Sequence, residues 1–149
     1  MQQWQKLRTL GWLDWQVILF SLVALPWCAV SLRLRGFQKT RAAFYASELA
    51  AGEYAATLDQ LDRARRVARA VDLAALYGPY RANCLKRSLV LCRQLHKRKL
   101  PGQLRLGASR PGGEFSAHAW VEVGGNVIND QPEIPARFAV LDTHGRKGR

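Results

Sequence analysis

The spacing of hydrophobic residues changes along the chain and separates a helical first part from a strand-containing second part. An uncharged run rich in Leu, Val, Ile, Phe and Trp extends from Trp15 to Leu32. Apolar residues then recur every three or four positions from Thr57 to Leu76 and again from Asn83 to Leu95, as expected for amphipathic helices. After Pro101 the period shortens to two, which is typical of strands. Helices followed by strands predict an α+β fold.

The uncharged run lies in an N-terminal apolar and basic helical segment, residues 1–51. Its length is near the lower limit of roughly 17 residues for a helix that spans a bilayer. Pro26 and two serines interrupt its apolar character, and Arg33 and Arg35 follow it directly. A helix docked on the protein or on a partner, an interfacial membrane anchor and a spanning helix are all compatible with this pattern. We expect docking or a peripheral membrane contact rather than a span.

Residues 52–149 are expected to form one further domain. The helical pattern of residues 37–51 ends at Gly52, and Thr57 is a suitable N-cap for the next helix. Gly124-Gly125 separates two apolar runs and predicts a hairpin. Alternating residues predict short strands over residues 103–109, 116–123, 126–130 and 138–141.

Composition narrows the classes of function. The 149 residues are enough for a substantial core. Three cysteines, with no C-x-x-C pair, form no disulfide framework and indicate a reducing compartment, so we expect a cytoplasmic protein. The formal charge of +12 indicates acidic partners such as anionic lipid or an acidic polypeptide. The basic clusters lack interleaved aromatic residues, so a nucleic-acid-binding function is not expected. No glycine-rich phosphate loop is present.

Three residues form a candidate catalytic set. Cys84 lies in the first turn of its predicted helix, where free N–H groups and the helix dipole favour a thiolate. His118 and Asp130 lie on the two arms of the hairpin, as a base and its orienter would. A structural cysteine and histidine, or a zinc site that includes Cys84 and Cys92, are alternatives that spacing alone leaves open.

Whether the hairpin can bring the histidine and the aspartate together depends on whether the number of residues in its loop is odd or even. Side chains alternate between the faces of a strand, and cross-strand neighbours share a face. A two-residue turn at Gly124-Gly125 would place His118 and Asp130 on opposite faces, whereas an odd-length loop would place them on the same face. We therefore predict an odd-length loop or an equivalent bulge at this turn.

Four short stretches resemble one family closely. They are Asn83-Cys84-Leu85 at a helix start, Leu104 to Gly107 after Pro101-Gly102, Phe115 to Glu122, and Val127 to Asp130. Together they are similar to the bacterial lasso-peptide leader peptidases, members of the transglutaminase-like (papain-related) superfamily. The resemblance covers residues 55–142, and its Ala-His-Ala-Trp-Val-Glu string is specific.

The resemblance implies a fold and an activity. The fold would be that of a transglutaminase-like cysteine peptidase, with helices packed on a small antiparallel sheet. Such a hydrolase removes the leader of a ribosomally made precursor peptide. Cys84 would be the nucleophile, His118 the general base and acid, and Asp130 the orienter of the imidazole. The Cys84 N–H would be the first oxyanion donor, and Asn83 and Trp120 would contact substrate, with a plain core position left open as the alternative for Trp120. Glu122 is expected to be solvated.

The resemblance also implies partners. They are the precursor peptide, a separate leader-recognition protein and a lasso cyclase, because this chain has no room for a leader-recognition domain. We expect no cofactor or metal on this chain, and the family's dependence on ATP finds no explanation in its residues. Two alternatives stay open, namely an acyltransferase (transglutaminase) of the same superfamily and a non-catalytic basic module that binds a peptide or a membrane.

Overall fold

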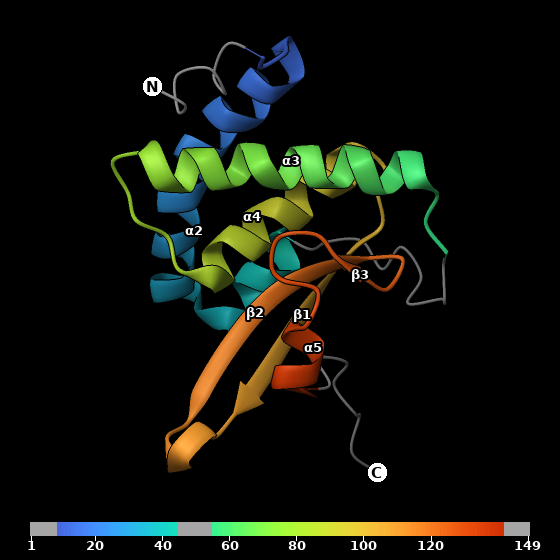
Figure 1. Cartoon of the computed structure of the whole chain (residues 1–149). Coiled ribbons are helices and arrows are strands. Elements are labelled where there is room, and N and C mark those ends of the chain that lie inside the picture. The colour runs from blue at the N-terminus through green and yellow to red at the C-terminus, as the bar shows by residue number, and fades with distance from the viewer. Residues whose placement is uncertain (1–8, 45–54, 142–149) are drawn as a thin grey trace, which may run out of the picture.

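The computed structural model describes residues 9–44 and 55–141 (Figure 1). Three helices come first, namely α2 (Trp12–Phe44), α3 (Leu58–Tyr77) and α4 (Cys84–Lys97). The second part holds β1 (Gly102–Ser109), the 3-10 turn η1 (Pro111–Gly113), β2 (Ser116–Val123), β3 (Asn126–Val127), α5 (Ile134–Arg137) and β4 (Ala139–Leu141). The α+β prediction is confirmed. The short helix α5 was not predicted, and the part of the predicted N-terminal helix beyond residue 44 lies outside the described residues.

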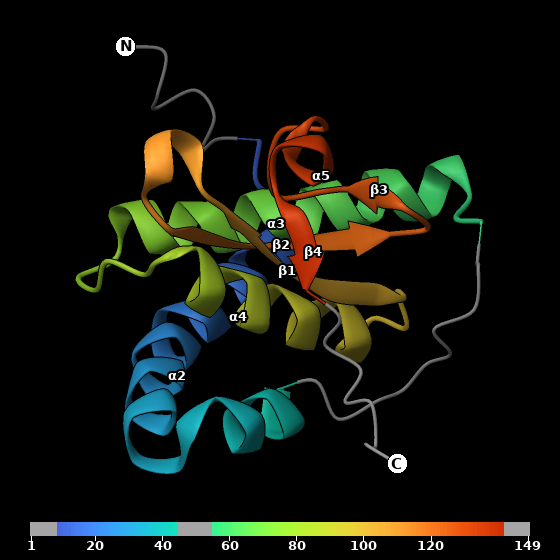
Figure 2. The ribbon, with the colours of Figure 1, turned by 90° about the horizontal axis from the view of Figure 1, so that it is seen from below.

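The strands form one antiparallel sheet in the order β3-β2-β1-β4. The long helices cover one face of this sheet, and α5 lies over the other, as Figure 2 shows from below. Because side chains alternate along β2, Ala119 and Val121 point into the helical layer, whereas His118 and Trp120 point to the α5 side. The sheet therefore presents the candidate histidine on the face that the long helices do not cover.

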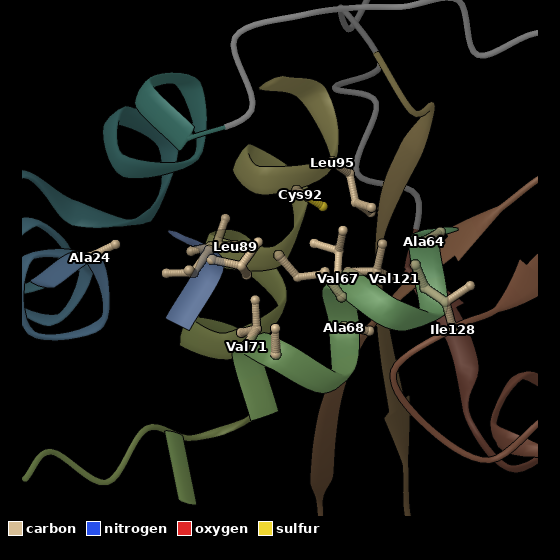
Figure 3. Close-up of a cluster of buried hydrophobic side chains, with 14 of the residues drawn as sticks. Ala24, Ala64, Val67, Ala68, Val71, Leu89, Cys92, Leu95, Val121 and Ile128 are labelled. Atoms are coloured by element: carbon tan, nitrogen blue, oxygen red, sulfur yellow. The ribbon is translucent and has the colours of Figure 1, made fainter. Parts of the chain in front are cut away.

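The main core lies between the helices and the sheet. Figure 3 shows Leu89 and Leu95 of α4 beside Val67 and Val71 of α3, with Val121 of β2 completing the cluster. Most of these side chains are almost fully buried. Burying a side chain of this size contributes roughly 1.5–3 kcal/mol. This packing holds α4 against β2.

Helix α2 contributes to the same core with one of its faces. Val17, Leu25 and Cys28 are buried in the main cluster. Asp14 is also buried, and its two oxygens accept hydrogen bonds of 2.8 Å from the guanidinium of Arg66 in α3. The Arg66 guanidinium lowers the pKa of Asp14 below its usual value of 3.8. The N-terminal helix is thus docked on this protein, and the described parts of the predicted regions 1–51 and 52–149 share one core.

The ends of the helices follow local sequence signals. Thr57 caps α3 in a capping box, in which its hydroxyl accepts a hydrogen bond from the N–H of Gln60 and its own N–H donates to the Gln60 side chain. Gly36 interrupts α2 with a φ angle of +78°, which glycine adopts without strain. The chain changes direction there, so that residues 37–44 turn away from the first part of α2 (Figure 2).

Candidate active site

His118 and Asp130 meet on the α5 side of the sheet. Nε2 of His118 lies 2.6 Å from Oδ2 of Asp130, and Oδ1 of Asp130 accepts a 2.7 Å hydrogen bond from the N–H of Gln131. The two side chains are 23% and 27% exposed, so solvent reaches both. When the Nε2–H group donates a hydrogen bond to the carboxylate, the Nδ1 atom carries the lone pair and can accept a proton.

The turn of the hairpin differs from our prediction. Val123 pairs with Asn126, so the loop consists of Gly124 and Gly125 alone. Their φ angles of +56° and +77° are those of a tight turn whose twist matches the flanking strands. The prediction of an odd-length or bulged loop is therefore wrong.

The histidine and the aspartate nevertheless meet, because β3 ends after its second residue. Ile128 still donates its N–H to the Val121 carbonyl at 3.1 Å. The N–H of Val121, however, donates to the side chain of Asn129 at 2.8 Å, where a regular ladder would use the Ile128 carbonyl. The alternation of the strand stops at this point. Asp130 can therefore turn to the face of His118, which a continued two-residue hairpin would forbid.

Ser88 of α4 completes the junction. Its hydroxyl accepts a 3.1 Å hydrogen bond from Nδ2 of Asn129 and donates at 3.3 Å to the carbonyl of Ala119. Ser88 is fully buried, and a buried hydroxyl without partners would be costly. Side chains from a helix and a loop thus satisfy the edge groups of β2 that β3 leaves unpaired.

Cys84 is the first residue of α4 and lies one helical turn before Ser88 on the same side of the helix. Ser88 contacts Ala119, whereas Leu95 lies beside Gly102, the cross-strand partner of Val123. Helix α4 therefore runs along β2 with its Cys84 end toward the His118 end of the strand. Oδ1 of Asn83 accepts a 3.1 Å hydrogen bond from the N–H of Lys86. Asn83, which we expected to contact substrate, therefore uses its side-chain oxygen to cap this helix.

The contact between the cysteine and the histidine is the missing part of the expected triad. Within the described residues no hydrogen bond joins the Cys84 thiol to His118. Such contacts are often long in the absence of substrate and shorten in the reacting complex. The arrangement thus supplies a base with its orienter and, on a separate element, a thiol at a helix start, which are the groups that acyl transfer through a thioester uses.

The three cysteines differ in their surroundings. Cys28 and Cys92 are fully buried, whereas Cys84 is half-buried. Burial raises the pKa of the Cys28 thiol to about 11 and raises the pKa of Cys92 further, because a thiolate is poorly solvated in an apolar core. Cys84 is therefore the cysteine most available as a nucleophile.

Comparison with known proteins decides the family. The sequence pattern of the transglutaminase-like superfamily matches residues 24–143. The chain belongs to this superfamily.

A curated relative supports a narrower likeness. The chain is 38% identical over 63 residues to the microcin J25-processing protein McjB of Escherichia coli. The match spans 42% of this chain and 29% of that protein. No solved structure matches.

Glu122 differs from our prediction, whereas Trp120 takes the core position that the sequence left open as an alternative. Trp120 is fully buried, so its ring does not contact a substrate in this conformation and packs with the small cluster around Phe138. Glu122 is also buried rather than solvated. Its carboxylate accepts a 2.8 Å hydrogen bond from the Trp120 indole and a 3.1 Å bond from Arg105. Both residues support the strand that carries His118.

Aromatic rings pack beside the imidazole. The ring centroid of His118 lies 5.2 Å from that of Phe138 and 6.3 Å from that of Trp120. Gly107 is the cross-strand partner of His118. A Cβ atom at Gly107 would lie 2.6 Å from Phe138 and 2.8 Å from the Trp120 ring, closer than packing allows. The absence of a side chain at residue 107 therefore makes room for the rings.

Asp72 of α3 is a further carboxyl near the site that sequence reasoning missed. Burial raises its pKa, an effect opposed by Arg87, whose guanidinium lies 3.5 Å away, and reinforced by the negative charge of Asp130. The sequence signal was an acidic residue on the otherwise apolar side of α3. Ser88 and Asn129 were also missed, since their contacts depend on where β3 ends.

A groove elsewhere on the molecule has a different character. It lies between the start of α2 and the middle of α3 and has a volume of about 880 Å³. Arg65, Arg66 and Arg69 line it, together with Asp14 and Asp62. The candidate catalytic residues do not line it. Among the described residues no group of three or more His, Cys, Asp or Glu side chains could hold a metal ion.

Proposed function

We propose that the protein is a cysteine peptidase that removes the leader from a lasso precursor peptide. The observation that carries this proposal is the 2.6 Å contact between His118 and Asp130. Support comes from the position of Cys84 at the start of α4 and from membership of the transglutaminase-like superfamily. The similarity to the microcin J25-processing protein supports the choice of a lasso precursor as the proposed substrate.

The proposed reaction begins with the transfer of the Cys84 thiol proton to Nδ1 of His118. The thiolate attacks the carbonyl carbon of the bond between leader and core, and the oxygen becomes an oxyanion. The N–H of Cys84, at the positive end of the α4 dipole, stabilises this charge. His118 then gives its proton to the departing amine of the core peptide, which leaves the leader as a thioester on Cys84.

Water completes the proposed cycle. His118 removes a proton from a water molecule, which attacks the thioester carbonyl. The thiolate leaves and is reprotonated, and the leader departs with a free carboxylate. Asp130 keeps the imidazole in the required tautomer and stabilises its charged form. The free cysteines fit a reducing compartment, so the proposed reaction takes place in the cytoplasm.

The proposed partners follow from the substrate. A separate leader-recognition protein presents the precursor, and a cyclase closes the ring of the released core peptide. The surplus of basic residues on this chain suits an acidic partner. No cofactor takes part in the proposed thiol chemistry, and an ATP dependence of the assembled system is implied by the family resemblance alone.

Thiol labelling tests the proposed nucleophile without a substrate. Iodoacetamide at pH 8 should modify Cys84 rapidly and leave Cys28 and Cys92 unmodified, because burial holds the pKa of Cys28 at about 11 and that of Cys92 higher. Mass spectrometry of tryptic peptides measures this selectivity. Equal labelling of the three cysteines in the native protein would contradict the assignment and favour a non-catalytic binding module.

Cleavage of a precursor tests the proposed activity. The protein is mixed with a lasso precursor peptide and a leader-recognition protein, and the products are identified by mass. Cys84→Ala should abolish cleavage, whereas the matched variant Cys28→Ala should retain most of it. If an added amine, rather than water, takes the acyl group, the product mass will identify an acyltransferase instead.

A further inference from the structure

Helix α2 is apolar on two opposite sides, but only one of them is covered by the described residues. Its outer side carries seven large side chains with three- or four-residue spacing, which we call the outer stripe: Trp12, Trp15, Leu19, Val23, Trp27, Val30 and Leu34. Each is between 44% and 78% exposed. A helix that is hydrophobic all round is ordinarily buried all round. An exposed apolar patch of this extent marks an interaction surface.

The dimensions and composition of the outer stripe suit a lipid surface. From Trp12 to Leu34 it extends about 33 Å at 1.5 Å per residue. Three of its seven members are tryptophans, which prefer the boundary between hydrocarbon and headgroups. Helix α2 is long and apolar enough to cross a membrane by length and composition.

The inner side of α2 determines how the helix can lie. Asp14 is fixed to Arg66 of α3, and Arg63, Arg65 and Arg69 of α3 are exposed. A helix that crossed the bilayer in this packing would carry these charges into hydrocarbon, which is costly. A helix that lies in the plane of the surface would leave them in water.

Charge selects the kind of lipid. Arg33, Arg35 and Lys39 are exposed at the end of the outer stripe. The sole acidic residue of α2, Asp14, is buried and paired. The whole chain has a formal charge of +12. An anionic surface would attract this arrangement, since each basic residue near such a membrane contributes about 1 kcal/mol.

A small cavity beside the stripe has the same mixed character. It has a volume of about 200 Å³ and is lined by apolar side chains, Val23 and Trp27 of the stripe among them, and by Arg93 of α4. The Arg93 guanidinium lies 5.9 Å from the Phe20 ring centroid, and the Lys97 ammonium lies 4.0 Å from that centroid. An apolar hollow with Arg93 at its wall and Lys97 near Phe20 matches the chemistry of an acyl chain below an anionic headgroup.

We propose that the outer stripe of α2 lies in the plane of an anionic membrane surface, with its tryptophans at the headgroup boundary and the catalytic face of the sheet in water. This contact goes beyond the proposed peptidase function and does not depend on it. It gives the protein a peripheral attachment that leaves the core between α2, α3 and α4 intact.

Vesicle binding tests the proposal. The full-length protein is sedimented with vesicles of phosphatidylglycerol and phosphatidylcholine, or with vesicles of phosphatidylcholine alone. Binding should be at least about tenfold stronger to the anionic vesicles, and Trp12→Gln/Trp27→Gln should weaken it at least about tenfold, because binding scales with buried apolar area and anionic charge. The matched control is Leu58→Gln/Leu76→Gln, which changes two exposed residues of α3 and should bind as the wild type does.

The depth of the helix separates an in-plane contact from a span. Trp12 and Trp27 lie about 22 Å apart along the helix axis. In vesicles with lipids brominated at one depth, Trp12→Phe and Trp27→Phe should remove similar fractions of the fluorescence quenching. Strongly unequal fractions would indicate a span and overturn the in-plane contact.

Further results would overturn the proposal. One is a lack of binding to anionic vesicles by a wild-type protein whose circular dichroism shows it to be folded. The other is a dimer in sedimentation velocity that the stripe variant, but not the control variant, converts to a monomer, since a second copy would then occupy the stripe. Equal binding by the stripe variant and the wild type would also exclude the stripe as the contact.

Discussion

The two ends of the β2–β3 hairpin are held by different kinds of hydrogen bond. At the turn, the backbone of Val123 pairs with that of Asn126 across two glycines. Near Val121 the second strand has ended, and the side chains of Ser88 and Asn129 bond to the edge of β2 instead. The regular end sets the register of the strands. The irregular end determines where Asp130 points, so the geometry of the candidate site depends on side chains that are not themselves candidates for catalysis.

The largest effect, on the rate of cleavage, is expected from replacing the Asp130 carboxylate at the irregular end of the hairpin. Asp130→Asn should lower the rate of leader cleavage at least about a hundredfold. A neutral amide neither holds the imidazole in the required tautomer nor stabilises its protonated form. The melting temperature should change little. Asp72→Asn is the matched control, since this nearby carboxyl bonds to Arg87, and it should cleave within a few fold of wild type. If Asp72→Asn lowered the cleavage rate more than Asp130→Asn does, Asp72 would be the orienter of the imidazole.

The next effect comes from removing the side chain that replaces the strand. Asn129→Ala leaves the Val121 N–H and the Ser88 hydroxyl each without one partner, and should lower the free energy of unfolding by about 3 kcal/mol. Cleavage should fall as Asp130 loses its fixed position. Asn126→Ala, at the regular end, removes only contacts with neighbouring carbonyls of the turn and should change stability by less than about 1 kcal/mol. Urea denaturation measures both values, and similar losses would remove the distinction between the two ends.

A smaller effect is expected where β2 is supported by β1. Glu122→Ala leaves the buried indole N–H of Trp120 without its acceptor, which should cost about 2 kcal/mol of unfolding free energy. Glu122→Gln keeps an acceptor and loses only the charge toward the partly exposed Arg105, so its cost should stay below about 1 kcal/mol. Equal costs would show that the ion pair, rather than the indole hydrogen bond, accounts for the buried carboxylate.

The smallest effect is expected at the turn. Gly125 has a φ angle of +77° with open space around it, so Gly125→Ala should cost about 1 kcal/mol through backbone strain alone. Gly125→Asn should cost less, because asparagine adopts this conformation more readily. Cleavage by both variants should remain within about twofold of wild type. A large loss of cleavage would show that the turn, and not the junction at Asn129, orients Asp130.

Periodicity predicted the regular elements well, and it failed where side chains replace backbone partners. The spacing of apolar residues identified α3, α4, β1 and β2, and the capping residue Thr57 was recognised from its type. The turn was mispredicted because we assumed that the strand continued to Asp130. Nothing in an alternating pattern reports that an asparagine will bond to the neighbouring strand, or that a buried glutamate has an indole as its partner.

Gly107 has a further consequence for His118. The missing side chain lets Phe138 and Trp120 occupy one side of the imidazole, while Asp130 holds its Nε2 edge. An unconstrained imidazole would sample several side-chain rotamers and ring orientations, and each would have to be given up at the moment of reaction. Here that restriction of rotation accompanies folding, so the entropy is lost before a substrate binds. If His118 is the base, as we propose, this order reduces the entropic cost of the chemical step.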